Sequence, residues 1–137
     1  LFRSRLARVE PGVSNLELQQ AAEELGFFWP PDPTSATVCT LGGNLACNAA
    51  GPRAVKYGTC RENTLGLVAV TGEGRVLHTG VRTTKRVVGY DLTRLIIGSD
   101  GTLAVITEAT LRLVPLPEAR ATLQALYRDV HAAARAV

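Results

Sequence analysis

The sequence predicts an α+β domain in which neighbouring strands pair directly and short helices connect them. The segment Leu65–Thr71 reads as a strand, a Gly-Glu-Gly turn follows at 72–74, and Arg75–Thr79 returns as a second strand. Leu103–Val114 alternates apolar and polar residues, which is typical of a strand with one face in water. The tight hairpin favours antiparallel pairing and does not supply the βαβ alternation of a doubly wound dinucleotide-binding domain.

The first elements are predicted from local signals. Leu6–Val9 could end a strand. Ser14 and Glu17 have the spacing of a capping box, so a helix is expected over residues 15–25, with Gly26 as its stop.

The middle of the chain is punctuated by proline and glycine. Prolines 30, 31 and 33 exclude a helix or a central strand and predict a stiff loop. A helix of small residues is expected at Asn44–Ala50, a polar loop at Val81–Val88, and a short helix at Asp91–Leu95 with Asp91 as its cap. Gly98–Thr102 is expected to be a glycine loop.

Two units are predicted, at residues 1–117 and 118–137. Pro115 and Pro117 end the first unit. Beyond them, Ala121–Tyr127 could be a strand and Asp129–Val137 starts a helix. Because one strand and one helix cannot bury a core, we expect residues 118–137 to be the start of a second domain and the chain to be a fragment.

Composition excludes several function classes. The chain has 137 residues, 46% of them hydrophobic and 20% charged, which suits a globular domain with one core. Its net charge of +3 comes from scattered basic residues, so a nucleic-acid surface is not favoured. No apolar run approaches the roughly 20 residues that a membrane-spanning helix needs.

No metal site or catalytic triad is predicted. The three cysteines lack metal-type spacing, and the two histidines lie far apart in the sequence. An odd cysteine count without a signal peptide favours a reducing compartment, and a cytoplasmic location is expected, with possible attachment to a membrane through partner subunits.

The segment TLGGNLACNAAG at 40–51 has almost no large side chains. Glycines at the entry of a helix let backbone N–H groups approach a phosphate. Close packing of a helix on a sheet explains the same small residues, and the pattern alone favours that explanation. Two other segments, Gly98–Thr102 and Lys56–Gly58, leave the same choice between a ligand contact and an ordinary turn.

The order of these motifs resembles one family of flavoproteins. It runs PDPTS at 31–35, TLGGNLACNAAG at 40–51, KYGT at 56–59, GYDL at 89–92 and GSDGTLAVITEATLRL at 98–113. This order is similar to the FAD-linked subunit of glycolate oxidase and to D-lactate and other D-2-hydroxyacid dehydrogenases. These belong to the superfamily named for vanillyl-alcohol oxidase and p-cresol methylhydroxylase. The resemblance covers the chain from about Val9 onward.

The resemblance implies an antiparallel sheet flanked by helices, the second subdomain of a p-cresol-methylhydroxylase-type FAD domain. It implies FAD as cofactor and hydride transfer from a D-2-hydroxy acid to the flavin. It assigns loop-shaping roles beside the flavin to Pro31, Asp32 and Pro33. It assigns diphosphate and flavin contacts, chiefly through backbone N–H groups, to Ser35, Thr40, Gly42, Gly43 and Asn44. The wall of the site would continue through Ala46, Asn48, Gly51, Tyr57 and Gly58. Val105 and Ile106 would offer backbone hydrogen bonds to the cofactor.

The chain departs from the family pattern at three positions. The family usually has Glu at the position of Asp100, Gly at that of Ala104, and often Gly at that of Ala50. The added methyl groups would lie near a tight cofactor wall. No catalytic residue can be named in this chain, and a D-2-hydroxy acid substrate and further oxidase subunits or an electron acceptor are the implied partners. The alternative is a structural or binding module without a cofactor.

Overall fold

The computed structural model describes residues 2–3, 5–81 and 89–136. Its main sheet has five strands in the order β1-β2-β6-β4-β5, and every neighbouring pair is antiparallel. The strands are β1 (Phe2–Arg3), β2 (Leu6–Val9), β4 (Thr64–Thr71), β5 (Val76–Gly80) and β6 (Ala104–Arg112). A small second sheet pairs β3 (Phe27–Phe28) with β7 (Val114–Pro115). The predicted α+β fold with an antiparallel sheet is therefore confirmed.

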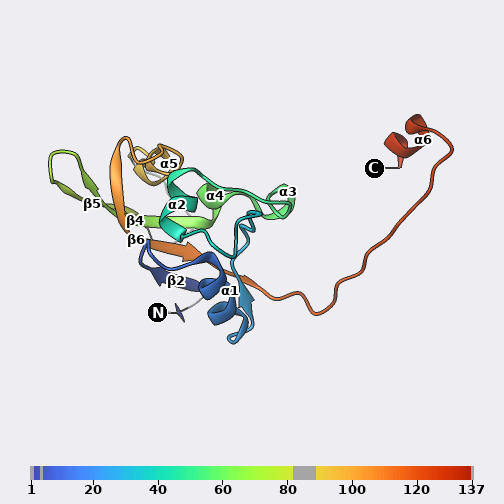
Figure 1. Cartoon of the computed structure of the whole chain (residues 1–137), viewed down its shortest axis with the longest axis horizontal. Coiled ribbons are helices and arrows are strands. Elements are labelled where there is room, and N and C mark those ends of the chain that lie inside the picture. Colours follow the sequence, from blue (N-terminus) through green and yellow to red (C-terminus); the bar gives the residue numbers. More distant parts are fainter. Residues whose placement is uncertain (1, 4, 82–88, 137) are drawn as a thin grey trace.

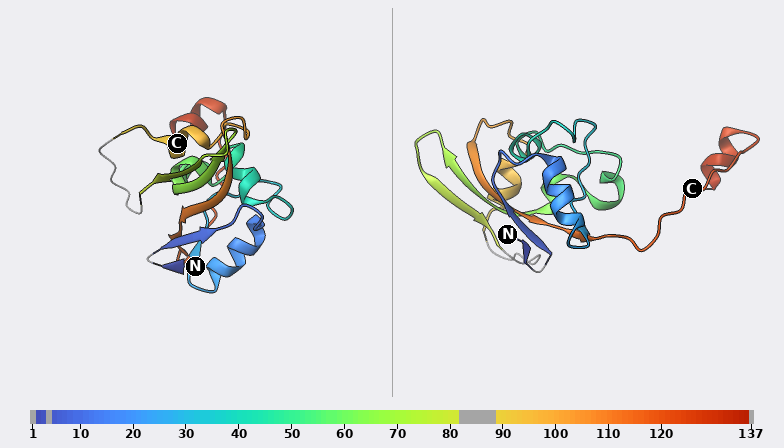
Figure 2. Two further views of the ribbon diagram at one scale, coloured as in Figure 1. Left: turned by 90° about the vertical axis from the view of Figure 1, so that its left-hand side faces the viewer. Right: turned by 60° about the horizontal axis from the view of Figure 1, so that its bottom comes forward.

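Short helices accompany this sheet. They are α1 (Asn15–Glu23), α2 (Leu41–Ala46), α3 (Ala54–Tyr57), α4 (Cys60–Asn63), α5 (Leu92–Ile96) and α6 (Val130–Arg135). Helices α2, α4 and α5 lie on one side of the sheet, whereas α6 lies apart at the end of an extended segment (Figures 1 and 2). Within the described residues, no helix combines the length and the hydropathy that crossing a bilayer requires.

The hairpin of β4 and β5 is present as predicted. Leu67 faces Thr79 and Ala69 faces Leu77 across it. The Gly74 N–H donates to the Thr71 carbonyl at 2.9 Å, and Gly74 has a φ of +79°, which glycine adopts at no steric cost. Strand β4 pairs on its other edge with β6, so these two strands form the centre of the sheet.

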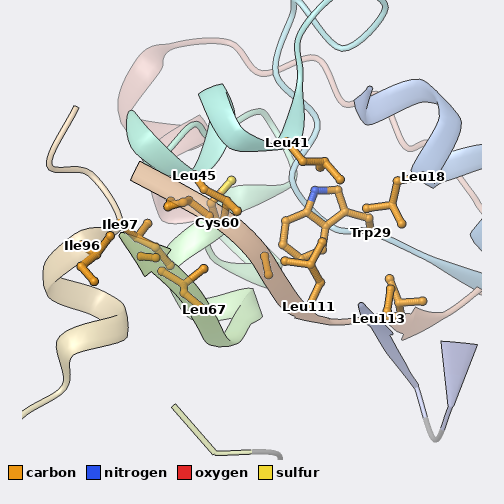
Figure 3. Packing of buried hydrophobic residues seen from close by; sticks show 14 of the residues in the cluster. Leu18, Trp29, Leu41, Leu45, Cys60, Leu67, Ile96, Ile97, Leu111 and Leu113 are labelled. Atoms are coloured by element: carbon orange, nitrogen blue, oxygen red, sulfur yellow. The ribbon is translucent and has the colours of Figure 1, made fainter. Parts of the chain in front are cut away.

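The core lies between the sheet and the helices (Figure 3). Trp29 is fully buried, and Figure 3 shows it among Leu18, Leu41, Leu111 and Leu113. A second group beside it holds five buried side chains from four segments: Leu45, Cys60, Leu67, Ile96 and Ile97. Burying such side chains contributes about 1.5–3 kcal/mol each relative to exposing them, so this layer holds α2 and α5 against the sheet.

Most predicted element starts agree with the structure. Ser14 caps α1, since its Oγ accepts from the Glu17 N–H at 3.1 Å and its own N–H donates to Glu17 Oε2 at 2.8 Å. The helix ends at Glu23, two residues before the predicted end. Asp91 caps α5 by accepting from the Arg94 N–H at 3.0 Å.

Two element predictions are wrong. The helix expected at Asn44–Ala50 is α2, which begins at Leu41 because Thr40 is its N-cap, so the paired glycines lie inside its first turn. Residues 121–127 form no strand, because no other strand pairs with them and all are exposed. Of the polar loop expected at 81–88, residues 82–88 lie outside the described residues.

Candidate functional site

An open pocket of about 430 Å³ lies between the first turn of α2, the loop that follows α5, and the start of β6. Six residues that the resemblance assigned to the cofactor line it: Thr40, Gly42, Gly43, Ala46, Val105 and Ile106. The rest of the lining is Pro11, Gly12, Ile96, Ser99, Gly101 and Ala104. The fold thus brings together two predicted segments that are about 60 residues apart in the sequence.

Glycines keep this pocket open. A Cβ added to Gly12 or to Gly101 would have no other atom within 4 Å, and one added to Gly43 would meet only Thr40 Oγ1, at 3.4 Å. Side chains at these three positions would extend into free space, and at Gly12 and Gly43 the backbone has no positive φ. The three residues therefore form a cradle that a bound group can enter.

Gly42 is glycine for a different reason. A Cβ there would lie 2.6 Å from the Cβ of Pro11, which is closer than side chains approach one another. The Gly42 N–H also donates to the Pro11 carbonyl at 2.9 Å. Of the two adjacent glycines, Gly42 allows close contact with Pro11, whereas Gly43 leaves space at the pocket.

The backbone N–H groups at this turn are already hydrogen-bonded within the chain. Leu41 N–H donates to the Val13 carbonyl at 2.9 Å, and Asn44 N–H donates to the Thr40 carbonyl at 3.0 Å. Gly43 N–H donates to Thr40 Oγ1 at 3.3 Å, the longest of these bonds. Gly43 therefore offers a ligand mainly its open surface, and the assignment of cofactor contacts to these N–H groups stays a prediction.

Ser99, which lines the pocket, carries a buried polar atom, its Oγ. This oxygen has no hydrogen-bond partner among the residues that the structure describes. A buried hydroxyl without a partner costs about 1–3 kcal/mol, so it favours a ligand that can bond to it. Ser99 was not among the predicted residues, although the glycine loop at 98–102 that contains it was recognised as a possible ligand contact.

The pocket lining has no titratable side chain. Just outside it, the hydrogen bond between the Cys47 thiol and the Asp100 carboxylate raises the pKa of Cys47. Asp100 itself has a φ of +51°, and its N–H donates to the Ala46 carbonyl at 2.9 Å. The pocket can bind and orient a ligand, but none of its lining side chains can take a proton from one.

Outside the pocket, a cluster around Asp32 and Arg53 fixes the loop that contains prolines 30, 31 and 33. Asp32 accepts from the Arg53 N–H at 3.2 Å and pairs with Arg53 Nε at 3.1 Å. The Arg53 guanidinium lies 5.6 Å from the ring centre of Phe28, which packs edge-on against Tyr57 at 5.3 Å. A Cβ on Gly51 would collide with the Asp32 backbone carbonyl. This Asp32 cluster therefore gives several of the predicted residues a structural role outside the pocket.

The remaining predicted residues are not brought together. Asn44 is buried, and its Nδ2 points to Asn15 Oδ1 at 3.4 Å and to Cys39 Sγ at 3.2 Å. Asn48 Oδ1 accepts from two groups at the start of α4, and Gly58 takes a φ of +82° before that helix. Pro31 is buried, Pro33 is half-buried and Ser35 is exposed. Within the described residues, no group of three His, Cys, Asp or Glu residues is placed to hold a metal ion.

Comparisons with known proteins identify the family of this chain. A family model described as FAD binding domain matches residues 3–80. The glycolate oxidase subunit GlcD of Bacillus subtilis is 48% identical over 131 residues, which are 96% of this chain and 28% of that protein. The mitochondrial D-lactate dehydrogenase [cytochrome] of Arabidopsis thaliana is 50% identical over 110 residues, which are 80% of this chain and 19% of that protein.

A solved structure has the same fold. An alkyldihydroxyacetonephosphate synthase superposes with a TM-score of 0.72 at 31% identity, over 84% of this chain and 20% of that one. The chain thus spans between about a fifth and three tenths of the length of these relatives. The matched segment covers β1 to β5, including the first turn of α2 that forms one wall of the pocket. With more than half of its residues in that match, the chain belongs to the FAD binding domain family.

Proposed function

We propose that this chain forms part of the FAD site of an oxidoreductase that converts a D-2-hydroxy acid, such as glycolate or D-lactate, to the 2-oxo acid. Family membership supports FAD, and the names of the two relatives support this class of substrate. When bound, FAD supplies the redox chemistry, accepting a hydride from the α-carbon of the acid. The protein's task in this region is to hold and orient the cofactor.

The pocket between α2 and β6 is the observation that carries this proposal. Its volume of about 430 Å³ lies in the range of small-molecule sites, and an extended dinucleotide would occupy it with one part only. Gly43 and Gly101 let that part approach the backbone, and Val105 and Ile106 give it an apolar wall. The unpaired Ser99 hydroxyl would bond to a polar edge of the cofactor.

The predicted residues outside the pocket keep a supporting role in this proposal. The Asp32 cluster would fix the proline loop beside the cofactor, with Ser35 exposed at its end. Asn44 and Asn48 would hold the two ends of α2 in place, through Asn15 and through the start of α4 respectively. Because no pocket side chain takes up a proton, the group that accepts the substrate's hydroxyl proton is proposed to lie outside this lining.

We further propose that residues 1–117 form a cofactor subdomain and that residues 118–137 begin a second domain that contributes to substrate binding. The relatives are several times longer than this chain, which leaves room for such a domain. The partners would be the small 2-hydroxy acid together with other oxidase subunits or an electron acceptor. The assembly is proposed to work in the cytoplasm.

A titration with FAD tests the proposal. We expect a saturable change in the visible absorption of the flavin as this chain is added. Gly43→Leu should weaken that binding by at least about tenfold, because the side chain fills the cradle while the backbone φ permits it. Gly72→Leu is the matched control, since Gly72 lies in the exposed β4–β5 turn with no atom near its Cβ direction.

The alternative, a structural module without a cofactor, makes the opposite prediction. Its support is that the N–H groups of the first turn of α2 already have partners within the chain. It predicts no saturable change at millimolar FAD. Equal binding by the wild-type chain and the Gly43→Leu variant would place the cofactor elsewhere on the molecule.

A further inference from the structure

One wall of the pocket is a loop, residues 98–101, that is hydrogen-bonded to the end of α2. The Gly98 N–H donates to the Leu45 carbonyl at 3.0 Å, and the Asp100 N–H donates to the Ala46 carbonyl at 2.9 Å. Both carbonyls belong to the last turn of α2, and that of Leu45 also accepts from the Asn48 N–H at 3.1 Å. The width of the pocket therefore depends on how firmly this loop is fixed to α2.

Arg61, the second residue of α4, contacts this loop from the side of α4. Its Nη2 donates to the Ile97 carbonyl at 2.8 Å, and Ile97 is fully buried. A Cβ on Gly98 would lie 2.6 Å from the same Nη2, so the guanidinium lies directly against the first residue of the loop. Among the described residues, no carboxylate forms an ion pair with Arg61, so its guanidinium serves the backbone.

The backbone of Arg61 is tied to the same end of α2. Its N–H donates to Asn48 Oδ1 at 3.0 Å, and Thr59 Oγ1 donates to the same oxygen at 2.8 Å. Asn48 has a φ of +52° at the point where the chain leaves α2. Arg61 therefore connects three parts of the fold: the end of α2, the start of α4 and the first residues of the 98–101 loop.

We propose that Arg61 is a positioning residue for the cofactor pocket, fixing the wall that carries Ser99 and Gly101 at its distance from Gly43. This inference rests on the proposed function, because it gives that pocket to FAD. The planar guanidinium bonds to the carbonyl of a fully buried residue and lies against Gly98, a combination that a shorter or apolar side chain does not provide. Without the bond, the Ile97 carbonyl loses this partner, while the loop keeps its two backbone bonds to α2, the bond from the Ser99 N–H to the Ile96 carbonyl at 3.1 Å, and the bond between Asp100 and the Cys47 thiol.

Three variants of this chain test the inference. Arg61→Met keeps the length of the stem and removes the donor, whereas Arg61→Lys keeps one donor. Arg75→Met makes the same change in the β4–β5 turn, where 78% of the Arg75 side chain is exposed. Hydrogen exchange of the Gly98 and Asp100 amides is followed by NMR without FAD, and FAD affinity and the flavin absorption spectrum at saturation are measured in parallel.

We expect Arg61→Met to speed exchange at both amides by about tenfold relative to amides in the centre of β4, the order expected for one lost hydrogen bond from a charged donor. FAD binding should weaken by a similar factor, and the spectrum of the fully loaded protein should change. Arg61→Lys should recover part of each effect, and Arg75→Met should match the wild type. A residue that only stabilises the fold would leave the spectrum at saturation unchanged.

The inference is overturned if Arg61→Met leaves exchange at Gly98 and Asp100 unchanged relative to β4. It is also overturned if exchange rises while FAD affinity and the saturated spectrum stay as in the wild type. Failure of the proposed function has a different signature, which is a wild-type chain that binds no FAD. Since the wall would then enclose no cofactor site, Arg61 would position a loop and nothing more.

Discussion

At the scale of the residue, the two adjacent glycines of α2 have separate causes. Gly42 is required by the contact with Pro11, whereas no contact among the described residues requires glycine at position 43. This difference supports the proposal that a ligand enters the pocket at Gly43. The different roles of Gly42 and Gly43 can be tested by measuring the free energy of unfolding of variants at each position, without any cofactor present.

Alanine at each glycine should change stability in opposite directions. Gly42→Ala should lower the free energy of unfolding by about 1–3 kcal/mol, because the new methyl group overlaps Pro11. Gly43→Ala should raise it by up to about 1 kcal/mol, because alanine favours a helix more than glycine does and meets only an ordinary contact. Urea unfolding of the two variants checks this, and a shift of the same sign in both would refute the distinction.

The buried thiol of Cys60 predicts how stability changes in alkali. Burial is the main cause that raises its pKa to about 12 from 9.0. Below pH 9 the thiol is neutral in the folded and the unfolded chain, so stability is unaffected. Between pH 9 and 12 only the unfolded chain loses this proton, so the free energy of unfolding falls by up to about 1.4 kcal/mol per pH unit.

Cys60→Ala removes this titration. The variant should be less stable at pH 7, since a fully buried side chain becomes smaller, but its stability should fall less steeply above pH 9. Unfolding curves recorded between pH 7 and pH 11 give both slopes. Parallel slopes for the variant and the wild type would show that Cys60 does not titrate as its burial implies.

At the scale of the element, side-chain caps determine where the longer helices begin. Ser14 and Glu17 bond reciprocally at the start of α1, and these bonds with Ser14 lower the pKa of the Glu17 carboxyl. The stabilisation from this carboxylate is present above its ordinary pKa and is lost as the pH falls through the lowered one.

Ser14→Ala should lower the free energy of unfolding at pH 7 by about 1 kcal/mol, the usual cost of removing a serine N-cap. The loss should shrink in acid, where protonation of Glu17 already weakens the capping box. Ser35→Ala is the control, because Ser35 is exposed and its side chain caps no helix. Equal stability of both variants at pH 7 would show that the cap contributes nothing.

Local signals within each element determine which helices and strands could be predicted from the sequence. The β4–β5 hairpin and the starts of α1 and α5 follow from turn glycines and caps only a few residues away, so local patterns were sufficient. The start of α2 was misplaced because Thr40 was interpreted as a ligand contact and not as a cap. The strand expected at 121–127 does not form, for the opposite reason: its residues suit a strand, but within the described part of the chain no strand lies beside it to pair with it.

The site was predictable only in part. The motif order identified the segments around Gly43 and Val105, and the structure shows that these two segments line one pocket. The place of Ser99 and Arg61 could not be predicted, because it depends on packing between segments that are distant in sequence. Nor could the motifs show that the side chain of Asn44 turns inward, away from the pocket.

At the scale of the whole molecule, the compact body ends where β7 ends. The segment 118–129 is exposed throughout, and α6 lies away from the sheet (Figure 2). A chain that stops after Pro117 should therefore unfold at nearly the same temperature, within about 2 °C, because little buried apolar surface is removed. Calorimetry of the two chains measures this, and a much lower midpoint for the shorter chain would place part of the core beyond residue 117.

NMR can detect whether FAD binds in the pocket between α2 and β6, as proposed above. Amide chemical shifts of this chain are followed while FAD is added up to millimolar concentration, which detects even weak binding. The account predicts saturable shifts at Gly12, Gly43, Ser99, Gly101 and Val105, and none in the β4–β5 turn at 72–74. Shifts confined to another surface, such as the groove between β2 and α1 that is lined by Val9, Val13 and Ala21, or no shifts at all, would refute it.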